Sequence, residues 1–159
     1  MRIKSLFLAL LFGSVIVAFF LFSIILNNNL GLPVFSNPFL DFLGIILFLI
    51  GIFTHLASIY FFKHIGKGTP VPIEPPKKLV HAGLFKFVRN PMYLAIFTDI
   101  FGGFFIFGHL LIFVYAIVFF VFIHLYVILV EEPKLKERFG KEYEKYTKSV
   151  PRWIPKVVL

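Results

Sequence analysis

Two short segments that contain ionisable residues border the same long apolar stretch of the sequence. Arg89, Asn90 and Pro91 precede it, and the adjacent residues Glu131 and Glu132 follow it. Pro91 suits the first turn of a helix, so Arg89 and Asn90 would lie at a helix N-terminus, where free N–H groups and the helix dipole favour an anion. Arg89 can equally reach lipid phosphates. The glutamates are candidates for a proton acceptor, or for a polar stop paired with nearby lysines.

Further polar residues lie inside the apolar segments, where ionisable side chains are often functional. His124 shares a helical face with Glu131 or Glu132, two turns deeper, which fits either contact with a ligand or a hydrogen bond between helices. His55 and Asp99 fit either pairing with each other or lining a pocket. The five histidines have no metal-ligand spacing, so no metal site is predicted. The absence of cysteine excludes disulfides and cysteine nucleophiles.

The composition of the chain indicates a membrane protein. Of its 159 residues, 59% are hydrophobic and 15% are charged, whereas a soluble domain has roughly 45–50% and about 25%. Two apolar stretches are each long enough to cross a hydrocarbon core, and a third, residues 92–130, is about twice that length and should break at Gly108-His109. We predict an all-α, polytopic fold, a single membrane domain over 1–159, with four transmembrane helices at about 6–26, 39–62, 92–107 and 110–130.

The basic residues determine the predicted orientation. All 16 lysines and arginines lie in the N-terminal tail, in residues 63–89 or in residues 134–156, and the 27–38 loop and the 108–109 turn contain none. By the positive-inside rule, four spans then place both termini in the cytoplasm. The net charge of +8 is therefore a topology signal and an attraction to anionic lipid, so nucleic acid is not a predicted partner.

Two segments, 63–91 and 131–159, form the predicted cytoplasmic surface. Four prolines between residues 70 and 76 exclude a helix there, so this part of the chain should run extended. Pro133 is expected to redirect the chain after the fourth span. An amphipathic helix should follow on the surface of the protein or the membrane, with an apolar face formed by Leu135, Phe139, Tyr143 and Tyr146.

The residues of these two segments resemble those of a known family. The similar elements are the stretch Gly66–Pro76, the stretch from His81 to Tyr93 with Arg89-Asn90-Pro91-Met92-Tyr93, the pair Glu131-Glu132, and then Phe139-Gly140, Tyr143, Tyr146 and Pro151-Arg152. In this order around a transmembrane hairpin, they resemble the integral-membrane methyltransferases that include isoprenylcysteine carboxyl methyltransferases and phospholipid N-methyltransferases. The resemblance covers residues 63–155.

The resemblance implies that S-adenosylmethionine binds between the hairpin and the two cytoplasmic segments. With His124 added from its place on the fourth span, the predicted cofactor-binding residues are His81, Gly83, Leu84, Arg89, Asn90, Pro91, Tyr93, His124, Glu131 and Glu132. Arg89 and Glu132 are the predicted catalytic residues. The chain departs from the family at Asn90, where many members have histidine, and an amide cannot act as a base near neutral pH.

The predicted reaction is methyl transfer to a membrane-embedded or amphiphilic acceptor, either a lipid amine or a prenyl or lipid carboxylate. It would take place at the cytoplasmic face of an integral membrane protein, and positioning and exclusion of water should carry most of the acceleration. Two alternatives stay open. An NADPH-dependent lipid or sterol reductase shares an Arg-x-Pro-x-Tyr element, and a non-enzymatic membrane assembly module would need no nucleotide-like ligand. No pattern in the sequence requires an oligomer.

Overall fold

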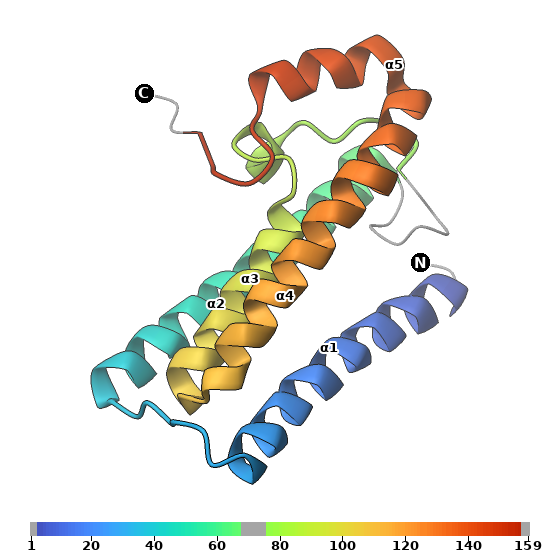
Figure 1. Ribbon diagram of the computed structural model, residues 1–159. Coiled ribbons are helices and arrows are strands. Elements are labelled where there is room, and N and C mark those ends of the chain that lie inside the picture. Colours follow the sequence, from blue (N-terminus) through green and yellow to red (C-terminus); the bar gives the residue numbers. More distant parts are fainter. Residues whose placement is uncertain (1–2, 68–75, 157–159) are drawn as a thin grey trace.

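The chain folds into helices joined by short turns, and the predicted all-α, polytopic fold is confirmed (Figure 1). The computed structural model describes residues 3–67 and 76–156. Most of the proline-rich stretch, residues 68–75, lies outside the described residues, as does the basic residue Arg2. The long helices are α1 (Ile3–Asn29), α2 (Pro38–Phe61), α3 (Pro91–Phe107), α4 (Leu110–Tyr126) and α5 (Glu132–Ser149).

Three helical stretches of the described chain are long and apolar enough to cross a membrane. They are Leu10–Asn29, Pro38–Gly66, and the continuous helix that begins at Leu110. The helix α3 is apolar but has 17 residues, which span about 25 Å at 1.5 Å per residue. This is shorter than a hydrocarbon core of about 30 Å, so neighbouring protein has to cover the ends of α3.

Helix α2 provides most of that cover because it packs very closely on α3. Its buried residues are Gly44, Gly51 and Ser58, which recur every seven residues and therefore form one stripe. A Cβ atom at Gly44 would lie 2.7 Å from the carbonyl oxygen of Gly102 on α3. Small residues allow such backbone approach between helices in a membrane, where apolar burial gives little driving force.

One polar pair lies within this α2–α3 interface. Nδ1 of His55 on α2 is 3.4 Å from Oδ2 of Asp99 on α3. The structure therefore pairs these two residues with each other, which was one of the two predicted arrangements. The pair also explains Gly51, because a side chain there would collide with the carboxylate of Asp99.

The turn between α3 and α4 lies at the predicted break, Gly108-His109. Gly108 ends α3 in the left-handed conformation, with φ 67°, which glycine adopts without strain. The loop after α1 pairs with this turn, since the N–H of Phe35 donates to the carbonyl of Gly108 at 2.8 Å. Asn27, fully buried at the end of α1, accepts from the N–H of Leu111 at 3.1 Å. These bonds satisfy polar groups that lipid could not.

The helix α4 does not end at the glutamate pair. It continues through a π-helical turn, η3 (Val127–Glu131), into α5, and the chain changes direction at Gly140 instead (Figure 1). The predicted redirection at Pro133 is therefore wrong. Pro133 lies in the first turn of α5, where the wider π turn accommodates its ring. Gly140 has φ 50° and ψ −126°, a conformation that other residues adopt only at a cost.

The polar parts of the chain gather at one end of the helices, which we call the polar end. It is formed by α5, residues 76–90 and residues 150–156 (Figure 1). Helix α1 contributes little to it, because Figure 1 shows α1 diverging from α4 toward its N-terminus. The contacts of α1 lie near its other end, where Phe19 stacks on Tyr115 with ring centroids 6.1 Å apart.

The α2–α3 contact gives a test of the fold. We expect Gly44→Leu to lower the free energy of unfolding of the detergent-solubilised protein by about 1–3 kcal/mol, the usual cost of overpacking, and to lower its unfolding temperature accordingly. The reason is that the opposing backbone of Gly102 cannot move aside. The matched control is Gly13→Leu on α1, where a Cβ atom meets nothing within 4 Å. Equal unfolding temperatures of the two variants would contradict this packing.

Candidate active site

The carboxylate of Glu132, in the first turn of α5, lies between two guanidinium groups. Oε1 accepts from Nη1 of Arg89 at 2.9 Å and from Nε of Arg152 at 2.7 Å, and Oε2 accepts from Nη2 of Arg152 at 2.9 Å. The hydrogen bonds that Arg152 donates to Glu132 raise the pKa of Arg152, against the effect of burial. Arg89 and Glu132 have side-chain exposures of 11% and 18%, so solvent screens this pair far less than a surface pair.

Backbone hydrogen bonds hold the same segments together. The N–H of Arg89 donates to the carbonyl of Pro151 at 2.9 Å, and the N–H of Lys156 donates to the carbonyl of Phe87 at 3.0 Å. Nδ2 of Asn90 donates to the carbonyl of Arg152 at 3.2 Å. We call residues 150–156 the C-terminal strap, since they run along the segment before α3 and carry Arg152 to Glu132.

Glu131 has a different partner from its neighbour. Its Oε2 accepts from the hydroxyl of Tyr93, in the first turn of α3, at 2.9 Å. No ion pair to Glu131 forms among the described residues. Burial raises the pKa of Glu131 above its usual value, and the negative charge of Glu132 adds to this effect, while the hydrogen bond from Tyr93 opposes it. Glu131 is therefore protonated more readily than an ordinary glutamate.

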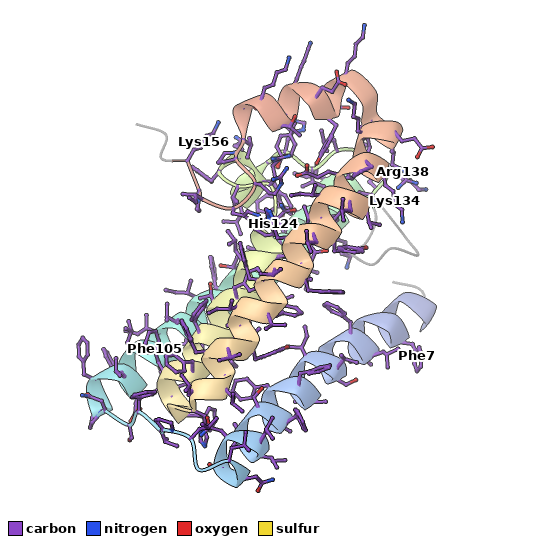
Figure 2. All side chains as sticks on the ribbon, viewed as in Figure 1. Phe7, Phe105, His124, Lys134, Arg138 and Lys156 are labelled. Atoms are coloured by element: carbon purple, nitrogen blue, oxygen red, sulfur yellow. The ribbon has the colours of Figure 1, made fainter. Side chains whose placement is uncertain are left out.

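Trp153 of the C-terminal strap reaches His124, which lies lower on the helix that carries the glutamates (Figure 2). Nε1 of Trp153 donates to Nδ1 of His124 at 2.9 Å. An indole N–H only donates, so Nδ1 of His124 carries no proton and the neutral ring has its proton on Nε2. One of the two predicted alternatives for His124 was a hydrogen bond between helices, and the observed partner is instead Trp153 of the non-helical strap.

Buried tyrosines of α5 support the site from the other side. Tyr143 and Tyr146 pack with Leu79 and Val150, and the hydroxyl of Tyr146 donates to the carbonyl of Phe85 at 2.8 Å. Burial, helped by the charge of Glu132, raises the pKa of Tyr143 to about 12, and burial also raises the pKa of Tyr146. Both phenols are therefore neutral near pH 7. The predicted apolar face of α5 forms this contact, with Leu135 and Phe139 at its margin.

The structure brings most of the predicted site residues into one cluster. Side-chain bonds connect Arg89 with Glu132, Tyr93 with Glu131, and Asn90 and His124 with the strap, and the buried Pro91 begins α3 among them.

Three of the predicted site residues are not joined to this cluster by side-chain bonds. The side chain of His81 is exposed, and no hydrogen bond joins it to another described residue. Gly83 has φ +58° and touches the ring of Phe61, so a side chain would not fit there. Leu84 contributes its carbonyl to a turn, accepting from the N–H groups of Phe87 and Val88.

The sequence interpretation did not assign Arg152 and Trp153 to the site. It named Arg152 only as part of the resemblance to the family. The available signal was the glutamate pair at the end of an apolar helix, where a poorly hydrated carboxylate needs a cation. That signal did not single out Arg152, because eight lysines and arginines lie between 134 and 156.

The comparison with protein families identifies the class of protein. The family model of phospholipid methyltransferases matches residues 39–142, about two thirds of the chain. The chain belongs to the phospholipid methyltransferase family. The matched region contains Arg89, Tyr93, His124 and both glutamates, begins with α2 and ends before the C-terminal strap. No curated protein matches the chain, and no solved structure does.

The central position of Glu132 leads to a prediction. Glu132→Gln should speed amide hydrogen exchange of peptides that contain Arg89 and Lys156 by about tenfold or more. The reason is that the largely buried guanidinium group of Arg89 and the more exposed one of Arg152 then lose their charged partner, at a cost of about 1–3 kcal/mol.

The control is Glu144→Gln, which removes the exposed pair with Lys136 (side-chain exposures 48% and 64%). We expect no change in these peptides, since exposed pairs contribute little. Equal exchange in the two variants would contradict the role of Glu132 in holding the strap.

Proposed function

We propose that this methyltransferase moves a methyl group from S-adenosylmethionine to the headgroup amine of a membrane phospholipid, at the cytoplasmic face. The observation that carries the proposal is the buried polar cluster of Arg89, Glu131, Glu132 and Tyr93, at the end of a transmembrane hairpin that matches the family. A site at this depth can accept an amphiphile sideways from the bilayer.

The residues of the cluster fit the proposed cofactor. S-adenosylmethionine supplies, when bound, a methyl group activated by its sulfonium. Nε of Arg89 is buried and donates to no described group, and a buried donor of this kind calls for an acceptor such as a carboxylate. Glu131 can accept a hydrogen bond from an ammonium, and the ring faces of Tyr93 and Trp153, 6.5 Å apart at their centroids, suit a cation or an adenine.

Glu131 favours an amine over a carboxylate as the acceptor. An amine must lose a proton to become a nucleophile, and Glu131 is a carboxylate with a raised pKa and no cationic partner among the described residues. A lipid carboxylate would need no base. The proposed base is therefore Glu131, while Glu132 positions Arg89 and Arg152.

The proposed orientation follows from the basic residues. Figure 2 shows the labelled side chains of Lys134, Arg138 and Lys156 at the polar end, far from the labelled Phe105. The loop 27–38 and the turn 108–109, at the opposite end, contain no lysine or arginine. The positive-inside rule supports a cytoplasmic polar end.

Cofactor binding tests the proposal directly. Titration of the detergent-solubilised protein should give saturable binding of S-adenosylmethionine and none of NADPH, which is the cofactor of the reductase alternative. Arg89→Ala should weaken binding of S-adenosylmethionine by about 10–100-fold, because hydrogen bonds to charged groups contribute about 1.5–3 kcal/mol. The control is Arg138→Ala, since Arg138 is exposed and bonds only a backbone carbonyl among the described residues. Saturable binding of NADPH alone would contradict the proposal.

The pH dependence of methyl transfer tests the role of Glu131. Only the ionised carboxylate accepts a proton, so activity should fall as the pH drops through the raised pKa of Glu131, at a higher pH than an ordinary glutamate would give. Glu131→Gln should lower kcat by about 10²–10⁴-fold and remove this acid limb. The assay uses labelled S-adenosylmethionine and vesicles that contain phosphatidylethanolamine. An unchanged acid limb in Glu131→Gln would exclude Glu131 as the base.

A further inference from the structure

An apolar groove lies between α3 and α4, within the membrane-spanning part of the hairpin. Its volume is about 350 Å³, and its lining exposes almost no polar surface. Three residues from each helix form its walls: Leu94, Phe97 and Phe101 on α3, and Ala116, Ile117 and Phe120 on α4.

The groove borders the candidate active site. Two of its wall residues, Phe97 and Phe120, also pack against the ring of Trp153, with centroid distances of 6.2 and 5.5 Å. Trp153 in turn bonds His124 and packs beside Tyr93, the partner of Glu131. The apolar groove and the polar cluster thus meet at the side chain of Trp153.

We propose that this groove holds one hydrocarbon chain of the phospholipid acceptor, with Trp153 marking the boundary between the chain and its headgroup. The proposal rests on the proposed function and adds the part of the lipid that the groove recognises. At about 30 Å³ per methylene, similar to a water molecule in the liquid, 350 Å³ accommodates roughly ten methylenes. This corresponds to much of one chain and excludes two.

The physical role of such a groove is orientation. A chain that moves from lipid into the groove exchanges one apolar environment for another, so it gains little hydrophobic free energy. The walls instead fix the direction of the chain along α3 and α4 and the depth of the headgroup. Holding the acceptor amine near Glu131 at a fixed depth lowers the entropic part of the barrier.

A pair of variants on α4 tests the groove through kinetics. Ile117→Trp should fill it, because Ile117 forms part of its wall, whereas Val118→Trp adds the same bulk at the neighbouring position, which does not line the groove. Both residues are exposed to lipid, by 48% and 62%, so both variants should fold, and their melting temperatures check this.

In lipid nanodiscs, Ile117→Trp should raise the KM for a long-chain phosphatidylethanolamine by about tenfold. It should leave the KM for a dibutyryl analogue and the affinity for S-adenosylmethionine unchanged. Val118→Trp should match the wild type. Equal KM values of the two variants for the long-chain lipid, or an equal loss with the short-chain analogue, would overturn the proposal.

Photocrosslinking separates this proposal from the proposed function. Wild-type protein in phosphatidylcholine nanodiscs receives a trace of phosphatidylethanolamine that carries a diazirine on one acyl chain. We expect crosslinks at the groove residues that excess unlabelled phosphatidylethanolamine displaces and excess phosphatidylcholine does not. Such crosslinks without any methyl transfer would refute the proposed function but support the groove. Crosslinks spread evenly over the groove and over Val118 and Phe122, or displaced equally by both lipids, would refute the groove even if methyl transfer occurs.

Discussion

The polar end depends on one constraint, the need to neutralise the carboxylate of Glu132 where an apolar helix leaves the membrane. Arg89 and Arg152 meet this need from two segments that lie far apart in the sequence. Removing the charge of Glu132 would leave both guanidinium groups without their anion, whereas removing either arginine would leave Glu132 with one cation. The pairing therefore ties α5, the segment before α3 and the C-terminal strap into one unit, and it fixes the position of Asn90, Tyr93 and Trp153.

The continuous helix from α4 to α5 explains how the adjacent residues Glu131 and Glu132 reach different hydrogen-bond partners. The π turn η3 ends at Glu131 and directly precedes Glu132, and its wider turn changes the direction in which these side chains point. Glu131 faces Tyr93, while Glu132 faces the two arginines. A π turn at such a position is a common feature of functional sites, and here it also makes room for Pro133. One distortion of the helix thus makes room for Pro133 and gives the two glutamates different partners.

Different forces stabilise the α2–α3 contact and the polar end. Small residues bring α2 and α3 into close contact, which depends on steric fit because apolar burial provides little free energy in lipid. The polar end depends on charge pairs and on hydrogen bonds that water would weaken. The family match includes both parts, since it covers α2 to the first part of α5. It leaves out α1, the helix that diverges from the others (Figure 1).

The sequence by itself determined the features that depend on local properties. Apolar length indicated the membrane helices, Gly108 marked the turn because a glycine ends a helix easily, and the types and order of Arg89, Tyr93 and the glutamates indicated the cluster. Only the tertiary structure decided that the chain turns at Gly140, that Arg152 completes the charge pairing, and that Trp153 joins His124 to the groove. The positions of Arg152 and Trp153 depend on contacts between residues 20 and 29 positions apart. Such contacts form only when the packing of the helices brings distant segments together, and no local pattern in the sequence specifies that packing.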